Sequence, residues 1–504
     1  METMESSSNI LWFEKEFMNR DSWLGPLVKI DQYRWEIPKS FKEGMRVPGL
    51  IYASEKLLSH IKMDMTPEQV ANVATLPGIV NYSLAMPDIH WGYGLPIGGV
   101  AAFDIGADGI ISPGGVGSDI NCGVRILTTQ LKLKEIKDRL EDLIQNLFEA
   151  IPSGIGSKGN IRLNEKELKE VLIKGSKWAV EKGYGEEEDL LHTEEKGALS
   201  GADPNNISSR ALERGFKQLG TLGSGNHFLE IQVVEKIYEE EIASVFGLEK
   251  DYIVIMIHSG SRGLGYQVCE DYLRFMQKVS EKYQISLPDR QLCCAPFNSP
   301  EGKKYFSAMA AAANYAWVNR QCIMHWTREV FMKTLSASPR DLKMKLLYDV
   351  AHNIGKIEEH LVSGKKISLC VHRKGATRAF PAGHKDIPER YQKVGQPVIV
   401  PGDMGRGSFV LVGTDKAMKE TFGSACHGAG RQMSRTKALK TTKGSKVIED
   451  LKEKGIIVKS ANYGTIAEEM PEAYKDVSEV IDTLHYAGIC KKVAKLRPLG
   501  VIKG

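Results

Sequence analysis

The stretch ISPGGVGSDINCGVRIL, residues 111–127, sets four glycines and a proline between short apolar runs. This pattern is typical of strands joined by tight loops, because glycine and proline interrupt regular structure. The same pattern occurs in LPGIVNYSLAMPDIHWGYGLPIGGVAAFD, residues 76–104. Asp119 and Cys122 lie in the first of these loops, three residues apart. The sequence therefore predicts strands whose connecting loops carry reactive side chains.

Helical patterns follow these strands along the chain. The spacing of apolar residues predicts helices within 133–150 and 164–182. The stretch 303–335 is rich in alanine and long apolar residues and contains no glycine, which favours one long helix. We expect that helix to be buried as part of the scaffold.

The domain organisation follows from where the informative loops lie. They are scattered from residue 88 to the end of the chain, and no internal repeat divides them. We therefore expect an N-terminal segment over 1–45 and one large α+β domain over 46–504. The acidic, polar stretch 184–205 is interpreted as a surface excursion of that domain.

Length and composition exclude several classes of protein. A chain of 504 residues buries a large core without staples, so any bound metal is expected to be functional. The 67 basic and 63 acidic residues give a net charge of +4, too small to indicate nucleic-acid binding by itself. The sequence has neither a membrane-spanning apolar run nor a signal peptide, so we expect a cytoplasmic protein with no membrane partner. Its eight cysteines are expected to be reduced.

Four histidines share one setting, at the boundary between an apolar run and a flexible loop. His258 follows YIVIMI, His352 follows LLYDVA, and His427 follows FGSAC. His227 lies between GTLGSGN and FLEIQVV. Side chains at such boundaries can converge on one cleft while the scaffold stays rigid. The alternative for each residue is an ordinary, partly buried histidine.

Asp119 and Cys122 extend this set of candidate ligands. Carboxylate, thiolate and imidazole together suit a borderline divalent ion such as Mn, Fe, Co or Zn. The donors are dispersed over more than two hundred residues, unlike the paired knuckles of structural zinc sites, so a catalytic site is favoured. One aspartate, one cysteine and three histidines are also enough donors for two incompletely filled ions, and a thiolate can bridge them.

Glycine loops next to these residues suggest phosphate binding. SGSRG (259–263), PGDMGRGS (401–408) and HGAGR (427–431) offer backbone N–H groups and hydroxyls. Turns alone also explain glycine clusters, so each loop is a weak signal by itself. Neither a P-loop motif nor a convincing Rossmann fingerprint is present.

Seven motifs occur in order along the chain. They are GGVGSDINCGVR (114–125), LGSGNHFLE (222–230), HSGSRGLG (258–265), YDVAHN (348–353), HRKGATRAFP (372–381), CHGAGR (426–431) and the terminal VIKG (501–504). With these motifs, the sequence from about residue 74 to 504 resembles the RtcB family of RNA ligases, the tRNA-splicing ligases. The resemblance implies a single RtcB-like α+β domain, with mixed β-sheets around a central metal cleft and peripheral helices.

The resemblance also implies an activity. Such a ligase joins RNA ending in a 2′,3′-cyclic phosphate or 3′-phosphate to RNA with a 5′-hydroxyl, using GTP and two Mn²⁺ ions. His427 would be guanylylated and would pass GMP to the RNA 3′-phosphate. Asp119, Cys122 and His227 would bind one manganese ion, and Cys122, His258 and His352 the other. The implied partners are GTP and RNA, either tRNA halves or other cleaved ends; an activating protein is left open.

The same resemblance assigns residues to the guanylate pocket. The implied nucleotide-binding residues are Asn226, His227, Phe228, Leu229, Glu230, His352, Asn353, Pro401, Gly402, Asp403, Met404, Ser408, His427, Gly428, Ala429, Gly430 and Lys503. The chain departs from the family pattern at two positions. Asp403 replaces a small hydroxyl residue, and Arg406 stands where the family is usually uncharged. A carboxylate there would accept hydrogen bonds from guanine but would repel phosphate.

Basic residues follow the candidate nucleophile. The basic band comprises Arg431, Arg435, Lys437, Lys440, Lys443 and Lys446, with no acidic residue before Glu449. Such a band could bind the phosphates of RNA, and the alternative is a solvated helix face. Arg373, Lys374 and Arg378 of HRKGATR could extend it.

Two further histidines stay outside the proposed ligand set. His372 ends the apolar run ISLCV and could line the cleft, and His90 follows Asp88 in a glycine-rich loop. For His90, orienting a substrate and a structural turn role are both open.

Two other functions remain compatible with the residues. A metal-dependent phosphohydrolase or nuclease would use the same donors with water as the nucleophile and would not need His427. A non-catalytic RNA-binding subunit would keep the basic band and tolerate loss of the donors.

Overall fold

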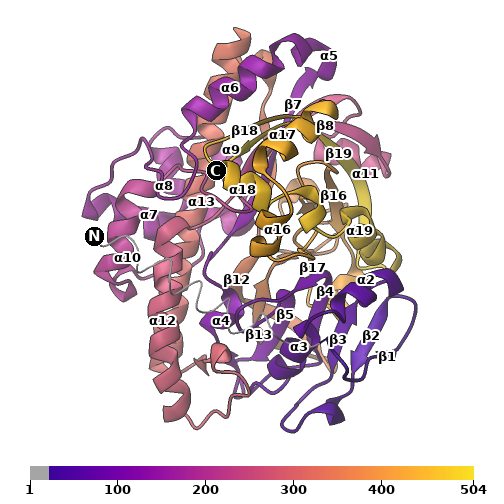
Figure 1. Cartoon of the computed structure of the whole chain (residues 1–504). Helices are drawn as coiled ribbons and strands as arrows, with labels where there is room; N and C mark the ends of the chain where they lie inside the picture. Colours follow the sequence, from indigo (N-terminus) through magenta and orange to yellow (C-terminus); the bar gives the residue numbers. More distant parts are fainter. Residues whose placement is uncertain (1–21) are drawn as a thin grey trace.

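Two mixed β-sheets form the centre of the structure (Figure 1). The computed structural model describes residues 22–504, so the first part of the expected N-terminal segment, 1–21, lies outside the described residues. The first sheet contains, in spatial order, β1 (Val28–Lys29), β2 (Arg34–Ile37), β3 (Gly49–Tyr52), β4 (Ser83–His90), β5 (Ile97–Asp104), β13 (Lys365–Lys374) and β12 (Asn353–Val362). Only β3 and β4 pair in parallel within it.

The second sheet carries most of the candidate ligands at its strand ends. Its spatial order is β11 (Lys345–Ala351), β7 (Gly123–Lys132), β9 (Tyr252–Ser259), β8 (Phe228–Ile237), β19 (Cys490–Lys503), β16 (Ser408–Gly413) and β15 (Pro397–Val400). A further strand, β18 (Ile457–Ser460), pairs in parallel with β19. Two short ladders join β10 (Ala295–Pro296) to β6 (Ile110–Ile111) and β14 (Ala376–Arg378) to β17 (Ser424–Cys426).

Some helices pack against the two sheets, and others pack against α12 and α13. In the first half of the chain they are α2 (Glu55–Ile61), α3 (Thr66–Val73), α4 (Pro113–Val116), α5 (Leu133–Ile136), α6 (Leu140–Ala150), α7 (Glu165–Lys174), α8 (Ser176–Glu181), α9 (Glu187–Leu191), α10 (Ser209–Gln218) and α11 (Glu240–Phe246). In the second half they are α12 (Arg262–Lys282), α13 (Pro300–Leu335), α14 (Pro339–Leu342), α15 (Asp415–Glu420), α16 (Arg435–Thr441), α17 (Gly444–Glu453), α18 (Tyr463–Glu468) and α19 (Val477–Tyr486).

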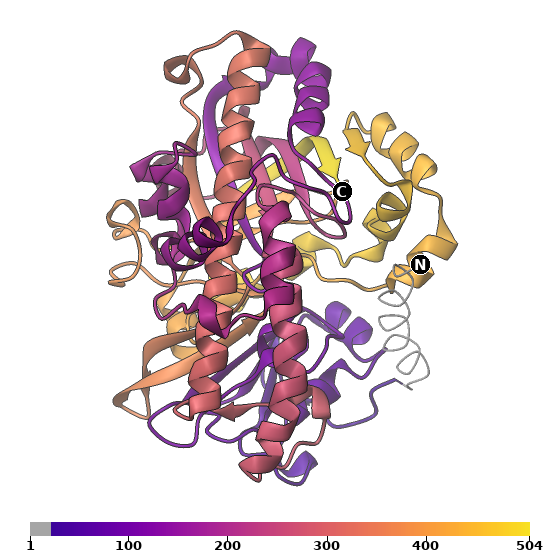
Figure 2. The same cartoon turned by 90° about the vertical axis from the view of Figure 1, so that its left-hand side faces the viewer.

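The long helix expected over 303–335 is present as α13. Ser299 caps its first turn by accepting a hydrogen bond from the Gly302 N–H, and Pro300 occupies the first turn, where no N–H is needed. Four consecutive alanines, 310–313, are fully buried. Figures 1 and 2 show α12 and α13 as two long helices lying side by side, and α13 also packs against β9. The helix is thus buried scaffolding, as predicted.

Two details of the sequence interpretation change. The helix expected over 164–182 is split into α7 and α8 at Gly175, whose φ of 57° is a left-handed value that favours glycine. The acidic stretch 184–205 is not a free surface excursion, because Asp189 and Glu194 within it are buried. Asp189 accepts two hydrogen bonds of 2.8 Å from Arg328 of α13. A buried carboxylate needs such partners, so the segment is fixed to the core.

The α+β class and the mixed sheets are as expected from the sequence. The boundary at residue 46 stays a prediction, and β2 on one side of it pairs with β3 on the other. All eight cysteines are free and buried. None of the helices within residues 22–504 combines the length and apolar character needed to cross a membrane.

Candidate metal centre and nucleophilic histidine

The candidate ligands converge because four neighbouring strands alternate in direction. In the order β11, β7, β9, β8, the first and third strands end where the second and fourth begin. His352 directly follows β11, and Cys122 directly precedes β7. His258 lies at the end of β9, paired with Val124 on one side and Phe228 on the other. These ends therefore share one edge of the sheet.

The side-chain donors form two groups that share one sulfur atom. Cys122, His258 and His352 are all buried, and their donor atoms lie within 4.8 Å of one another. The Cys122 Sγ is 3.1 Å from His258 Nε2, which is 3.2 Å from His352 Nε2. The second group contains Asp119, Cys122 and His227. In it, His227 Nε2 is 2.8 Å from Asp119 Oδ2 and 3.4 Å from the Cys122 Sγ.

The protonation states of these groups suit a divalent cation. Burial lowers the pKa of His258 and of His352 well below the usual value, so both imidazoles are neutral and can donate a lone pair. Burial opposes ionisation of Asp119, but His227 and Arg262 outweigh it and lower the pKa of the carboxyl. Burial and the Asp119 charge raise the pKa of the Cys122 thiol, which a bound metal would therefore have to deprotonate. The donor set fits a metal ion.

His427 lies beside this centre and is oriented by a buried carboxylate. Its ring centroid is 5.1 Å from that of His352, with the rings nearly perpendicular. Asp88 Oδ2 accepts hydrogen bonds from His427 Nδ1 at 2.6 Å, from the His427 N–H at 3.1 Å and from the Gly428 N–H at 3.3 Å. Because Nδ1 carries the proton in this arrangement, the Nε2 lone pair is left for nucleophilic attack. Gly375 permits the close packing, since a Cβ there would lie 3.0 Å from His427 Cε1.

Several of the residues predicted for the nucleotide pocket form one connected group. Gln232 Nε2 donates to Glu230 Oε2 at 2.5 Å and to Ser408 Oγ at 3.1 Å, and the Gly402 N–H donates to the same hydroxyl at 3.3 Å. Lys503 pairs in register with Phe228, and its Nζ lies 5.7 Å from that ring. Burial raises the pKa of Glu230 to about 7.

Other predicted residues occupy structural positions around this group. Asn353 donates to the Asp119 carbonyl at 3.1 Å and accepts from the Gly375 N–H at 2.9 Å. Asn226 is partly exposed in the turn before β8. Residues 401–404 and 427–430 lie outside helices and strands, in the loops that contain Pro401, Met404, Gly428, Ala429 and Gly430. Leu229 is fully buried in an apolar cluster behind the sheet.

The two unusual residues of the 401–408 loop neutralise each other. Arg406 Nε is 2.9 Å from Asp403 Oδ2, and the other carboxylate oxygen accepts from the backbone N–H groups of Gly405 and Arg406. Burial raises the pKa of Asp403, which favours the neutral acid, and Arg406 opposes that shift. Asp403 and Arg406 therefore occur together as a compensated pair.

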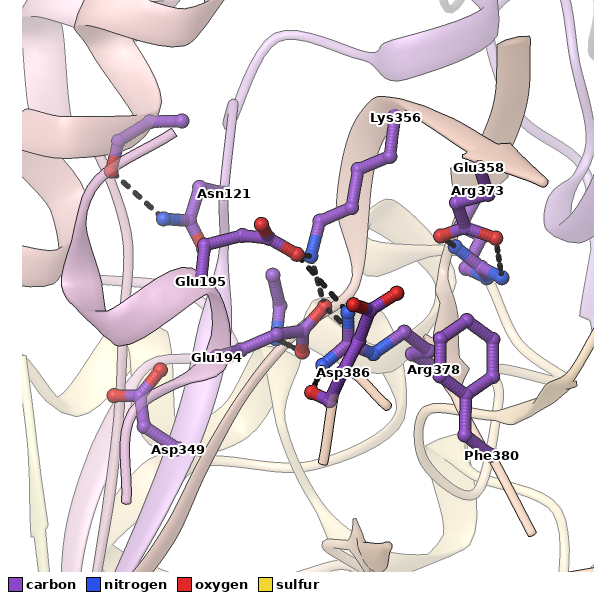
Figure 3. Close-up of polar contacts among 12 residues, drawn as sticks. Asn121, Glu194, Glu195, Asp349, Lys356, Glu358, Arg373, Arg378, Phe380 and Asp386 are labelled. Carbon is purple, nitrogen blue, oxygen red and sulfur yellow. Dashed lines mark hydrogen bonds and ion pairs between the residues drawn. The ribbon is translucent and has the colours of Figure 1, made fainter. Parts of the chain in front are cut away.

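The expected extension of the basic band is wrong, because Arg373 and Arg378 are buried and paired. Figure 3 shows Arg373 bonded to Glu358, and Arg378 beside Glu194 and Glu195. Lys374 is also buried, and its Nζ donates to the carbonyls of Tyr93, Leu95 and Gly114. These cations stabilise the interior and are not available to solvent.

The two histidines left outside the ligand set also have backbone partners. His372 is fully buried, and its Nε2 accepts from the Ser112 N–H at 3.1 Å. His90 Nδ1 donates to the Asp88 carbonyl at 2.9 Å. His372 thus has a structural role, and His90 helps to shape the strand that carries Asp88.

The basic band itself is partly compensated. Arg431 pairs with Glu469, and Arg435 lies 3.8 Å from the same carboxylate. Lys446 pairs with Glu449 and Asp450. The exposed residues Lys437, Lys440 and Lys443 have no carboxylate within ion-pair distance in the part of the chain that the structure describes. Three exposed lysines on and beside α16 thus form the uncompensated part of the band.

Sequence reasoning missed two residues next to the centre. Asp88 was noted only as the neighbour of His90, although it lies near the end of β4, which leads into a glycine-rich loop, a setting that resembles those of the other candidates. Arg262 lies in HSGSRGLG and donates to His227 Nδ1 at 3.2 Å, which leaves Nε2 directed at Asp119. Neither contact has a signal in local spacing, because the partners are far apart in the chain.

A buried cluster of carboxylate, thiolate and imidazole beside an oriented histidine is typical of metal-dependent enzymes that transfer phosphorus groups. Comparison with known proteins narrows this class. A family model described as tRNA-splicing ligase RtcB matches residues 69–504. The chain belongs to that family, as its motifs predicted.

Curated relatives agree over nearly the whole chain. The tRNA-splicing ligase RtcB of Archaeoglobus fulgidus is 57% identical over 480 residues, which cover 95% of this chain and 99% of that protein. The proteins of the same name from Thermococcus kodakarensis and Methanococcus maripaludis are both 55% identical, again over 95% of this chain and 99% of their own length.

Replacing Cys122 tests the shared sulfur. Cys122 belongs to both groups of donors, whereas His227 belongs to one. If each group holds one ion, Cys122→Ser should weaken the binding of both by more than about tenfold, because a serine hydroxyl does not ionise to a ligand at neutral pH. His227→Ala should weaken the binding of only one ion, the one held by the group that contains Asp119. Equilibrium dialysis against Mn²⁺ followed by metal analysis gives the stoichiometry.

Cys322→Ser, which changes a buried thiol of α13 outside both groups, is the control. Equal metal loss in both serine variants would contradict the assignment.

Proposed function

We propose that this protein is an RNA ligase that joins a 2′,3′-cyclic phosphate or 3′-phosphate end to a 5′-hydroxyl end, using GTP and two Mn²⁺ ions. The observation that carries the proposal is the geometry of His427. Its ring lies 5.1 Å from that of a candidate metal ligand, and Asp88 fixes the proton on its Nδ1. A hydrolase that activates water has no need of an oriented imidazole in addition to its ligands. Family membership supports the same activity.

In the proposed first step, His427 Nε2 attacks the α-phosphorus of GTP. The new bond is Nε2–P, the bond that breaks joins the α-phosphorus to the bridging oxygen, and pyrophosphate leaves. Asp88 stabilises the positive charge that develops on the ring, as the carboxylate partner of a catalytic histidine does elsewhere. The loop that presents His427 also directs the Gly428 N–H at Asp88, so the loop and the carboxylate keep a fixed relation.

Two metal ions fit the two groups of donors. Asp119, Cys122 and His227 would hold one ion, and Cys122, His258 and His352 the other. Bound there, the ions would supply positive charge that offsets the repulsion between an incoming nucleophile and the phosphate oxygens. His352 is a candidate ligand whose ring also packs against that of His427, so the ions would be bound beside the proposed nucleophile.

The guanine nucleotide would occupy the group formed by Glu230, Ser408 and Lys503. With a pKa of about 7, Glu230 ionises readily when N–H donors reach it, and guanine offers two such groups on its N1 and N2 edge. The ammonium group of Lys503 lies in the same group and suits an anionic or ribose oxygen. The Asp403–Arg406 pair closes one side without net charge.

The later steps transfer GMP and then release it. An oxygen of the RNA 3′-phosphate attacks the phosphorus on His427, so the P–N bond breaks and an RNA–GMP anhydride forms. The 5′-hydroxyl of the second RNA then attacks the 3′-phosphate, its proton passes to solvent, and GMP leaves with the electrons of the anhydride bond. A 2′,3′-cyclic end is first hydrolysed: water attacks the phosphorus, the bond to the 2′-oxygen breaks, and the 3′-phosphate remains. The exposed lysines on and beside α16 follow His427 in the chain and would contact the RNA backbone.

Labelling by GTP tests the covalent step. Incubation with α-labelled GTP and Mn²⁺, followed by denaturing electrophoresis, should give a labelled protein band. His427→Ala should abolish it, and His60→Ala, which changes an exposed histidine on α2, should retain it. RNA cleavage or phosphate release without a labelled band would favour a phosphohydrolase or nuclease. RNA binding with neither label nor reaction would favour a non-catalytic subunit.

Asp88→Asn tests the orientation of the nucleophile. The amide has nearly the shape of the carboxylate but has no charge and does not fix the proton on His427 Nδ1. We expect the rate of protein labelling to fall roughly 10²- to 10⁴-fold, in the range of general acid–base effects. Single-turnover labelling measures this rate. Asp104→Asn, at the end of neighbouring β5, is the control, since the carboxylate of Asp104 accepts a hydrogen bond from the local Gly106 N–H and not from His427. Wild-type labelling in the Asp88 variant would exclude the orienting role.

Salt dependence tests the RNA contact. The combined change of Lys437, Lys440 and Lys443 to alanine should reduce the slope of log affinity against log salt by about 2, at ~0.7 per phosphate contact of single-stranded RNA. Fluorescence anisotropy of a labelled RNA at several salt concentrations measures this slope. Lys446→Ala should have little effect, because that ammonium already pairs with Glu449 and Asp450. An unchanged slope in the triple variant would place the RNA elsewhere.

A further inference from the structure

The guanidinium of Arg320 lies next to the strands that carry the candidate metal ligands, and all of its N–H donors form hydrogen bonds there. Arg320, on α13, is fully buried. Its Nε and Nη2 each donate to Asp349 at 2.8 Å. Its Nη1 donates to the carbonyls of Asn121 at 2.8 Å and Ser259 at 3.0 Å, and Nη2 also donates to Asn121 Oδ1 at 3.1 Å. Arginine has five N–H donors, and these contacts occupy all of them.

Each acceptor belongs to a segment that carries one ligand of the same group. Asn121 directly precedes Cys122, and Ser259 directly follows His258. Asp349 lies on β11, the strand that ends immediately before His352. One side chain therefore connects the three chain segments that present Cys122, His258 and His352, the three residues of one donor group.

The backbone at Asn121 depends on this contact. Asn121 has a φ of 50°, a left-handed value that non-glycine residues seldom adopt. Its side chain bonds to Arg320 on one side and donates to the Ala313 carbonyl at 2.7 Å on the other. Its N–H donates to the Asn353 carbonyl at 2.7 Å. The turn that directs Cys122 towards the histidines is thus fixed by α13 and by the residue after His352.

We propose that Arg320 is a positioning residue of the metal centre, which holds the backbone on either side of the ligands at the spacing that the bound ion requires. The proposal rests on the metal binding described under the proposed function and assigns a role to a residue that touches neither metal nor substrate. A planar, five-donor fork is needed, because a lysine ammonium is a point charge with three donors and cannot span three segments. Contacts of this kind behind the ligands commonly govern metal affinity.

Arg125 provides a matched control within the same cluster. It is also fully buried, and its Nε donates to Asp349 at 2.8 Å. Its Nη1 donates to Gln321 and Met324 of α13, and it makes no hydrogen bond to Asn121 or Ser259. Changing either arginine to lysine therefore disturbs the same buried carboxylate. Only Arg320→Lys also removes the guanidinium hydrogen bonds to the backbone beside Cys122 and His258.

The experiment compares Co²⁺ binding by the full-length wild type, Arg320→Lys and Arg125→Lys. Co²⁺ serves as the probe because its thiolate charge-transfer and d–d absorption bands report the geometry around Cys122. We expect Arg320→Lys to lower the affinity of the Cys122–His258–His352 ion roughly 10- to 100-fold and to alter its bands. Arg125→Lys should keep the wild-type affinity and spectrum, even where thermal denaturation shows that it is equally destabilised.

The outcomes separate the two proposals. A wild-type spectrum and affinity in Arg320→Lys, or the same loss in both lysine variants, would overturn the positioning role. If the wild type itself binds no Co²⁺ and no Mn²⁺, the proposed metal-dependent function fails first, and Arg320 has only a structural role.

Asn121→Gly keeps the inference testable if Arg320→Lys does not fold. Glycine adopts the left-handed backbone freely, so this variant preserves the turn and removes the two side-chain hydrogen bonds to α13, with Arg320 and with the Ala313 carbonyl. We expect a loss in Co²⁺ affinity of roughly 2- to 10-fold, in the range of buried hydrogen bonds. Unchanged affinity with an unchanged spectrum would show that the link to α13 does not position Cys122.

Discussion

The alternating direction of four hydrogen-bonded strands decides where the reactive side chains lie. β11 and β9 run towards the edge of the sheet at which β7 and β8 begin, so residues at the ends of two strands and at the starts of two others meet there. Backbone pairing at fixed spacing, about 5 Å between strands, brings the donors close without any attraction between them. The close approach of several neutral imidazoles and a thiol is therefore a consequence of the sheet.

Burying polar and charged groups at such a site is unfavourable in free energy, and neighbouring groups of opposite charge offset this effect. Polar and charged groups without partners are unfavourable in the interior, and here the buried charges are compensated in networks. Arg125 and Arg320 both bind Asp349, and Lys356 is held between Glu194 and Glu195, as Figure 3 shows. Burial and the histidine cluster together keep the imidazoles neutral. The same low-polarity interior that disfavours charge thereby prepares the donors for a cation.

The sequence predicted the types of donor well and their partners poorly. The histidines at the strand ends and the Asp119–Cys122 loop could be recognised because residue type and local pattern can both be read directly from the sequence. The long helix over 303–335 was predicted for the same reason. Asp88 and Arg320 could not be recognised, since their roles come from contacts with residues 339 and 199 positions away. Local spacing carries no information on such contacts.

Charge was the least reliable signal, and the reason is physical. Arg373 in HRKGATR and Lys437 after CHGAGR look alike in a sequence, yet one is buried against Glu358 and the other is exposed. Whether a cation faces solvent depends on the carboxylate that the fold places beside it. The stretch 184–205 shows the converse, because its acids compensate cations of distant strands and helices.

The relation between His427 and the metal centre also limits which chemistry the site favours. An enzyme that activates water needs an open position on its metal, and extra imidazoles are then dispensable. Here the fold uses a buried carboxylate, two backbone N–H groups and a glycine at 375 to hold one more imidazole against the ligands. Fixing Nδ1 as the donor determines the tautomer and leaves the lone pair on Nε2. On this arrangement rests our proposal that the protein captures a phosphorus group on His427 before transferring it, instead of transferring it directly to water.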